Sequence, residues 1–153
     1  MLAKDIMTAN VTKVAKDTPA KEIAKLLIEK RISGVPVVDE HGCILGVVTE
    51  RDLLFKKKEP MSVSLVYQYG EYLDPEQLGE EWRKIRGSKA EEIMSKNIIC
   101  LPEDTPGAKI ASVMIKEGVK RVFIVRGKQL VGVVSKADIL KDVIMEMRKS
   151  NVG

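Results

Sequence analysis

One pattern of apolar and polar positions occurs twice and predicts the same two elements each time. Residues 46–54 read GVVTERDLL and residues 132–140 read GVVSKADIL. In each copy an apolar run is followed by a hydroxyl residue and, three positions later, by an aspartate, as in Thr49 and Asp52. A short apolar run bounded by polar residues predicts a strand, and apolar positions at helical spacing predict a helix. We therefore expect two strand-to-helix junctions, around which the rest of the chain is arranged.

The internal match extends over most of the chain. The further matched segments are 6–8 with 93–95, 17–19 with 104–106, 23–24 with 110–111, and 37–38 with 124–125. Self-similarity of this kind indicates one supersecondary unit used twice, with apolar faces that cover each other.

Each copy predicts the order strand, helix, strand, strand, helix, which gives an α/β (α+β) fold of two βαββα repeats. In the first repeat we expect strands at 11–14, 35–38 and 43–48, a helix that begins with Thr18 as N-cap and Pro19, and a helix from Thr49 to about 57. In the second we expect strands at 97–100, 122–125 and 130–134, and helices at 106–117 and from Ser135 towards Arg148. On the first helix, one face should hold Ile23, Ala24, Leu27 and Ile28.

The predicted domain boundaries follow from the repeat. The first repeat spans 1–57, a partly helical insert spans 58–88, and the second repeat with its C-terminal helix spans 89–149. The insert holds all three tyrosines and the only tryptophan (Tyr67, Tyr69, Tyr72 and Trp82). These aromatics fit either a cover packed on the side of the module or a surface for a partner or for self-association.

Composition narrows the class of protein. A chain of 153 residues, 44% of them apolar, can bury roughly 68–70% of its unfolded surface. No secretion signal is recognisable, and no apolar run approaches the ~18 residues that cross a membrane. Cys43 and Cys100 form no CxxC pair, which favours a reducing cytoplasm over a disulfide frame or zinc site. The net charge of +4 is compatible with anionic ligands, and the dispersed basic residues argue against nucleic acid.

The two hydroxyl-x-x-Asp sequences have two interpretations that do not exclude each other. Thr49 with Asp52, and Ser135 with Asp138, fit the capping box, in which a hydroxyl caps the helix start and a carboxylate reaches back. The same junction also has the groups that hold a nucleotide. A helix N-terminus favours phosphate, and a carboxylate can accept hydrogen bonds from both hydroxyls of a ribose.

The strand before each junction adds candidate residues. Gly34 permits close backbone approach, and Pro36 lacks an N–H, so its strand should be an edge strand or line a cleft. The equivalent residues of the second repeat include Lys120, Arg121 and Phe123. These are either two surface bases and a core phenylalanine, or phosphate ligands beside an aromatic wall for a base.

Residues 4–8 (KDIMT), 32–39 (ISGVPVVD) and 46–52 (GVVTERD) together resemble a CBS domain, and the second copy resembles another. The chain is thus similar to a stand-alone CBS-pair protein, also called a Bateman module, and the resemblance leaves out only the insert. It implies two repeats related by a pseudo-twofold axis, with clefts between them that bind AMP, ADP, ATP or S-adenosylmethionine. It also implies a homodimer.

The resemblance assigns residues to two nucleotide sites. The first would comprise Val11, Thr12, Ile32, Ser33, Gly34, Val35, Pro36, Thr49, Arg51 and Asp52. The second would comprise Ile98, Ile99, Val119, Lys120, Arg121, Val122, Phe123, Ser135, Lys136 and Asp138. In both, the hydroxyl and aspartate would hold phosphate and ribose, the apolar residues would frame adenine, and the basic residues would contact phosphate. Arg121 and Phe123 depart from the family pattern, and the added positive charge favours a phosphorylated ligand.

An enzyme is not expected. The single histidine, His41, lies in a predicted turn, and no cysteine or serine has a recognisable base partner. No cluster of carboxylates and histidines indicates a metal site. We therefore expect a cytoplasmic, non-catalytic sensor that binds an adenine nucleotide and signals to an unidentified protein target by a conformational or oligomeric change. The alternatives are a ligand-free scaffold that acts through its dimer surface and insert, and a sensor of S-adenosylmethionine.

Overall fold

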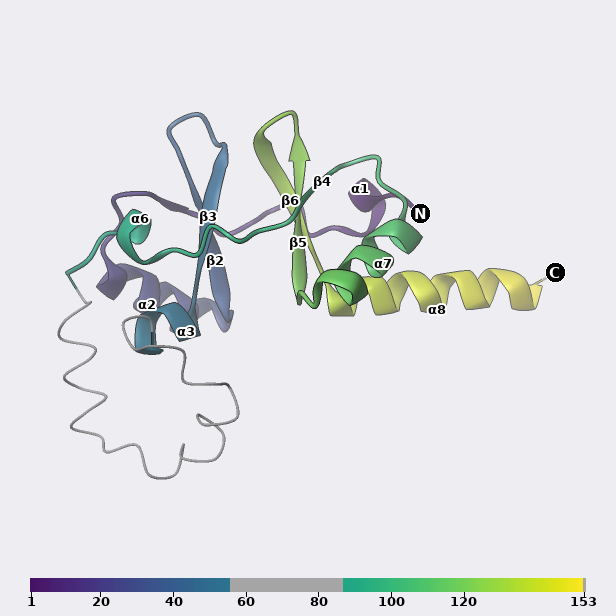
Figure 1. The fold of residues 1–153 in the computed structure, drawn as a ribbon. Helices are drawn as coiled ribbons and strands as arrows, with labels where there is room; N and C mark the ends of the chain where they lie inside the picture. Colours follow the sequence, from purple (N-terminus) through teal and green to yellow (C-terminus); the bar gives the residue numbers. More distant parts are fainter. Residues whose placement is uncertain (56–86, 153) are drawn as a thin grey trace, which may run out of the picture. The chain divides into compact units, whose positions relative to one another are not determined.

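The computed structural model describes residues 1–55 and 87–152, so the aromatic residues of the predicted insert lie outside the described residues. The first part contains α1 (Ala3–Ile6), β1 (Val14–Ala15), α2 (Ala20–Lys30), β2 (Gly34–Val38), β3 (Ile44–Thr49) and α3 (Glu50–Phe55) (Figure 1). The second part contains α6 (Ala90–Ile93), β4 (Cys100–Pro102), α7 (Gly107–Glu117), β5 (Arg121–Arg126), β6 (Gln129–Ser135) and α8 (Lys136–Val152). Both copies confirm the predicted βαββα order. No helix among these residues is long and apolar enough to cross a membrane.

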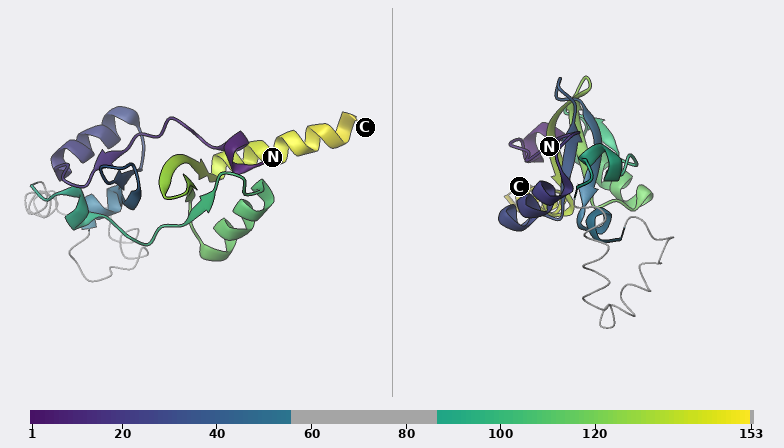
Figure 2. Two further views of the ribbon diagram at one scale, coloured as in Figure 1. Left: turned by 90° about the horizontal axis from the view of Figure 1, so that it is seen from above. Right: turned by 90° about the vertical axis from the view of Figure 1, so that its left-hand side faces the viewer.

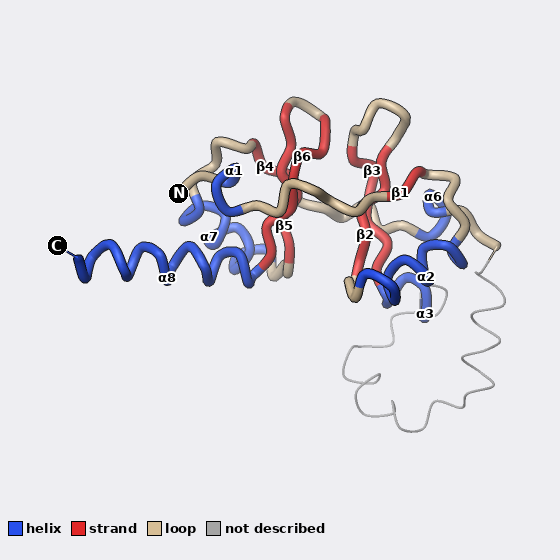
Figure 3. The backbone as a smooth tube through the Cα atoms, turned by 180° about the vertical axis from the view of Figure 1, so that it is seen from behind, coloured by secondary structure: helices blue, strands red, loops and turns tan. Residues whose placement is uncertain are grey.

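Each copy forms a three-stranded sheet with sequential strand order, β1-β2-β3 and β4-β5-β6 (Figure 3). β1 and β4 pair in parallel with β2 and β5, and β6 returns antiparallel to β5. β2 is therefore a middle strand, so the edge-strand alternative for Pro36 is wrong, and the alternative that its strand lines a cleft stays a prediction. The sheet tolerates this proline because β1 has only two residues, and its register with β2 begins at Val37, one residue past Pro36.

The backbone divides into two compact units that do not coincide with the two sequence repeats. One unit contains Met1–Thr12, Glu40–Ile44 and Asn97–Gly153, and the other contains Lys13–Asp39 and Leu45–Lys96. α1 therefore packs with the sheet of the second repeat, and α6 packs with the sheet of the first. α8 runs on well past the rest of its own unit (Figure 2).

The exchanged segments cap the first helix of each repeat through main-chain bonds. The Ala20 amide at the start of α2 donates to the Ser88 carbonyl (2.8 Å), and the Ala90 amide of α6 donates to the Thr18 carbonyl (2.8 Å). The predicted Thr18 cap is wrong, because Pro19 occupies the cap position and no side chain bonds there. The other unit repeats this arrangement, since the Gly107 amide at the start of α7 donates to the Met1 carbonyl (2.8 Å). The first amides of α2 and α7 thus bond to main-chain carbonyl groups that are distant in sequence. In many other helices a nearby side chain accepts these bonds.

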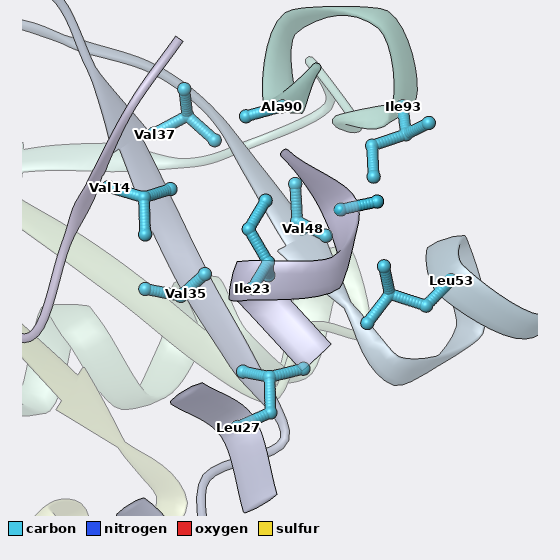
Figure 4. Close-up of a cluster of buried hydrophobic side chains, with 10 residues drawn as sticks. Val14, Ile23, Leu27, Val35, Val37, Val48, Leu53, Ala90 and Ile93 are labelled. Atoms are coloured by element: carbon cyan, nitrogen blue, oxygen red, sulfur yellow. The ribbon is translucent and has the colours of Figure 1, made fainter. Parts of the chain in front are cut away.

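An aliphatic core lies between helices and sheet in each unit. The unit that holds α2 buries Val14, Ala20, Ile23, Leu27, Val35, Val37, Val48, Leu53, Ala90 and Ile93 (Figure 4). The other buries Ala3, Ile110, Met114, Val122, Ile124 and Val134. α1 and α6 contribute to these cores, so neither sheet is covered by its own repeat alone. Along the predicted α2 face, Ile23 and Leu27 are buried in the core, whereas Ile28 is 78% exposed.

The residue that ends α2 adopts a conformation that favours glycine. Arg31 has φ 54°, whereas the equivalent residue after α7 is Gly118, with φ 65°. The left-handed region costs a side-chain-bearing residue about 1–2 kcal/mol, and glycine loses part of this advantage through its freedom in the unfolded chain. We expect Arg31→Gly to raise the free energy of unfolding by about 0.5–1 kcal/mol in urea titrations, and Gly118→Arg to lower it. A loss of stability in Arg31→Gly would show that the arginine side chain stabilises the fold.

Candidate functional site

The first junction joins the last residue of β3 to the start of α3. The Thr49 amide donates to Asp52 Oδ2 (2.9 Å), and the Thr49 hydroxyl donates to the same oxygen (3.2 Å). The Asp52 amide donates in turn to Thr49 Oγ1 (3.4 Å). This reciprocal pattern is the capping box that the spacing predicts.

The second junction, between β6 and α8, repeats the same bonds. The Ser135 amide and hydroxyl donate to Asp138 Oδ2 (2.9 and 3.1 Å), and the Asp138 amide donates to Ser135 Oγ (3.4 Å). Asp138 is only 7% exposed. Within the described part of the chain, both aspartates use Oδ2 for these bonds, and Oδ1 makes none. The capping role therefore leaves one carboxylate oxygen for a ligand at each junction.

The residue before β2 lies beside the first junction. Ser33 is exposed, and its carbonyl accepts a hydrogen bond from the Glu50 amide (3.0 Å). Arg51 is also exposed. Val35, in contrast, is fully buried in the core, and its place in the first site stays a prediction. Alternate strand residues point to opposite faces, and its neighbours Gly34 and Pro36 face away from this core.

Other predicted residues of the first site have different positions. Ile32 is partly buried and packs against the core of the same unit. Val11 and Thr12 belong to the other compact unit. Their contribution to the first site therefore stays a prediction.

All ten predicted residues of the second site belong to one unit. The Phe123 amide donates to the Ile99 carbonyl (2.9 Å), and Ile99 and Val119 pack against the core. Val122 is fully buried in that core, and its place in the second site stays a prediction. Phe123 is on the opposite face of β5 and is 2% exposed. Ile98 lies just before β4 and is partly buried.

The second junction carries more positive charge than the first. Arg121 pairs with Ser135 across the β5–β6 ladder, and Lys136, the first residue of α8, is exposed. Lys120, next to Arg121, is exposed as well. The equivalents of Lys120, Arg121 and Lys136 in the first repeat are Ser33, Gly34 and Glu50. The sequence analysis did not include Glu50 in the first site. Alignment of the two copies could have identified it, because Glu50 aligns with Lys136.

Nothing in the described residues indicates metal chemistry at these junctions. Within residues 1–55 and 87–152, no three side chains among histidine, cysteine, aspartate and glutamate come close enough to hold an ion.

Sequence comparison identifies relatives of this chain. The model of the CBS domain matches residues 3–59 and 90–145. An uncharacterized protein from Methanocaldococcus jannaschii is 31% identical over 147 residues, which is 94% of this chain and 32% of that protein. Inosine-5'-monophosphate dehydrogenase from Aquifex aeolicus is 38% identical over 117 residues, 75% of this chain and 23% of the enzyme. The chain thus spans a third or less of the length of these two relatives.

Solved structures share the fold. The CBS-pair protein CBSX2 from Arabidopsis thaliana matches with a TM-score of 0.78 and 20% identity, over 96% of both chains. A structure of CBSX2 in complex with AMP matches with a TM-score of 0.71 and 19% identity, over 95% of this chain and 98% of that one. With the family match over both repeats and the duplicated strand-to-helix junction, the chain belongs to the CBS-domain family and carries two copies of the domain.

Proposed function

We propose that this protein is a non-catalytic regulator that binds an adenine nucleotide, AMP, ADP or ATP, at its two strand-to-helix junctions. The observation that carries the proposal is the duplicated hydroxyl–aspartate pair, with the same hydrogen bonds in both units and one carboxylate oxygen left over. A helix cap alone does not require a hydroxyl residue and an aspartate at the same spacing in both copies, because other residue types also cap helices. The complex of CBSX2 with AMP supports the ligand class.

Each group at the second junction has a chemical role in this proposal. Asp138 Oδ1 accepts hydrogen bonds from the ribose hydroxyls, and the start of α8 favours the phosphates. Arg121, Lys136 and Lys120 add positive charge, which favours ADP or ATP over AMP. Ile98, Ile99 and Val119 frame the adenine.

The first junction has the same parts with less positive charge. Asp52 and Thr49 take the roles of Asp138 and Ser135, and Arg51 is the cation beside them. Glu50 replaces Lys136 and disfavours added phosphates, so this site prefers AMP. The two sites therefore respond to different phosphorylation states of one nucleoside.

The signal in this proposal is a shift between two arrangements of the units or of two protomers in a homodimer. A ligand shifts such a balance only through its different affinity for the two states. An unidentified protein target would recognise the arrangement that the nucleotide favours. Of the alternatives, S-adenosylmethionine shares the ribose contacts but carries a sulfonium in place of phosphates. A ligand-free scaffold would use the hydroxyl–aspartate pairs as helix caps only.

Isothermal titration calorimetry tests the proposal. Protein freed of bound nucleotide by unfolding and refolding is titrated with AMP, ADP, ATP, S-adenosylmethionine and, as a control, GTP. We expect selective binding of adenine nucleotides, with a stoichiometry that shows whether one or both junctions bind. A ligand at 100 times its Kd stabilises the protein by about 2.7 kcal/mol, which raises the Tm of a chain of this size by roughly 5–10 °C. No binding by any of the adenosyl compounds would favour the scaffold.

A further inference from the structure

Met7 and Met94 occupy equivalent positions of the two repeats, and each packs on a glycine of the opposite repeat. Met7 is the C-cap of α1, and Met94 is the C-cap of α6. A Cβ added to Gly132 in β6 would overlap the Met7 side chain, and a Cβ added to Gly46 in β3 would lie 2.9 Å from Met94 Sδ. Each thioether therefore fills the space where any residue other than glycine would place its own side chain.

The residue after each methionine attaches the α1 or α6 segment to the sheet. Thr8 and Val133 exchange two main-chain hydrogen bonds, of 2.9 and 3.1 Å, and Val47 and Ser95 exchange two of 3.0 and 2.8 Å. These four bonds hold the end of α1 at β6 and the end of α6 at β3. Because each methionine is directly next to the bonded residue, a change at its sulfur acts on these bonds.

The two methionines are less exposed than those on α8. Met7 and Met94 are partly buried, and each packs against the core of its own unit. Met145 and Met147 are 44% and 59% exposed. Susceptibility to oxidants increases with exposure, so we expect the α8 methionines to oxidise first. At Met7 and Met94, in contrast, an added oxygen enters a packed contact beside main-chain hydrogen bonds.

We propose that Met7 and Met94 form a paired oxidation site, whose oxidation releases the α1 and α6 segments from the two sheets. A peroxide transfers one oxygen atom to each sulfur. With hydrogen peroxide, the sulfur gives two electrons as the O–O bond breaks, and the products are the sulfoxide and water. The sulfoxide is larger and polar, so keeping it against the glycine costs both overpacking and burial of a polar group. If the side chain turns outward instead, the glycine loses its cover, and the contact is lost in either case.

The released segments lead directly to predicted residues of the nucleotide sites. Residues 11–12 follow Thr8 by three and four positions, and residues 98–99 follow Ser95 by the same number. Loss of the main-chain bonds at Thr8 and Ser95 should therefore weaken nucleotide binding. This consequence rests on the proposed function, whereas the oxidation site itself does not.

Peroxide treatment of matched variants tests the site. All proteins carry C43S/C100S, so that no thiol contributes. M7L/M94L removes the proposed site, and M145L/M147L removes two exposed methionines as the control. Leucine replaces methionine at nearly the same volume, so both variants should fold. Peptide mass spectrometry follows the sulfoxide at each methionine, and thermal unfolding gives the Tm.

The Tm should follow the oxidation of the two packed methionines and not that of the exposed ones. We expect it to fall by roughly 5–15 °C in the parent and in M145L/M147L, and to return after treatment with methionine sulfoxide reductases. M7L/M94L should keep its Tm while its exposed methionines oxidise. A loss of the same size in M7L/M94L would overturn the proposal, and so would an unchanged Tm in parent protein that is fully oxidised at Met7 and Met94.

Hydrogen exchange of the parent protein reports the release without a variant. The amides of Thr8, Val47, Ser95 and Val133 make the four main-chain bonds. Since local opening exposes such amides, we expect them to exchange at least about 10-fold faster after oxidation. Unchanged exchange at these amides would overturn the release of the segments.

Titration with AMP tests the consequence for nucleotide binding. We expect oxidised parent protein to bind AMP at least about 5-fold more weakly than reduced protein, and M7L/M94L to bind equally well before and after treatment. Equal affinity of oxidised and reduced parent protein would overturn this coupling. If the reduced parent binds none of the adenosyl compounds, the proposed function fails together with the coupling, whereas the Tm and the hydrogen exchange still decide the oxidation site.

Discussion

Asp138→Asn is expected to weaken binding of adenine nucleotide at the second junction by roughly 10- to 100-fold. A hydrogen bond to a charged group contributes about 1.5–3 kcal/mol, and the neutral amide replaces the carboxylate that would accept the ribose hydroxyls. The fold should lose less than about 1 kcal/mol, because the amide oxygen can still accept from the Ser135 amide. Calorimetry measures the first effect and urea unfolding the second.

Asp52→Asn is the matched variant at the first junction. It should remove the other binding event and leave the affinity of the second junction unchanged, so the two variants together assign each step of the titration. Unchanged nucleotide affinity in both variants, with the fold intact, would show that both carboxylates act only as helix caps. Binding lost together with a large loss of stability in Asp138→Asn would mean that the junction needs the charge for folding.

Gly46→Ala is expected to lower the free energy of unfolding by about 1–3 kcal/mol, a typical cost of overpacking. A Cβ at position 46 would lie 2.6 Å from the Ser95 carbonyl oxygen and 2.9 Å from Met94 Sδ. The contact is close because Val47 and Ser95 exchange two main-chain hydrogen bonds, of 3.0 and 2.8 Å. Urea titration measures the loss, and Gly87→Ala is the control, since no atom of residues 1–55 or 87–152 lies within 4 Å of its added Cβ.

Comparison with the equivalent glycine, Gly132, distinguishes crowding by main-chain atoms from crowding by side-chain atoms. Its added Cβ would overlap the Met7 side chain and meets no main-chain atom among its three nearest neighbours. We therefore expect Met7→Ala to relieve part of the cost of Gly132→Ala, whereas Met94→Ala should give little relief to Gly46→Ala. Equal relief in both pairs would contradict the close approach of the Ser95 carbonyl.

Local patterns were sufficient to predict the elements and the junctions. The order of strands and helices follows from apolar periodicity, and the capping boxes follow from the spacing of Thr49 with Asp52 and Ser135 with Asp138. In each case the residues that determine the structure are neighbours in sequence. The family resemblance rests on the same local motifs, which is why it could be recognised before the fold was known.

Features that depend on distant partners could not be predicted in this way. The spacing at Thr18 is that of an N-cap, but the Ser88 carbonyl binds the first amide of α2 instead. Ile28 shares a helical stripe with Leu27, but the stripe does not tell which of its side chains is buried, and Ile28 is exposed. Pro36 indicated an edge strand, because the sequence does not show how short the neighbouring strand β1 is.

α1 packs with the sheet of the second repeat and α6 packs with the sheet of the first, so neither repeat has a complete core by itself. A fragment of residues 1–57 would contain α1 without the core that buries Ala3, and it would lack the α6 residues Ala90 and Ile93 that complete the core around α2. Cutting the chain between the repeats would therefore not release two independent domains. Point mutations can change the function of either repeat separately. A single repeat, however, lacks part of its core, so we expect that it cannot be transferred to another protein as a folded domain.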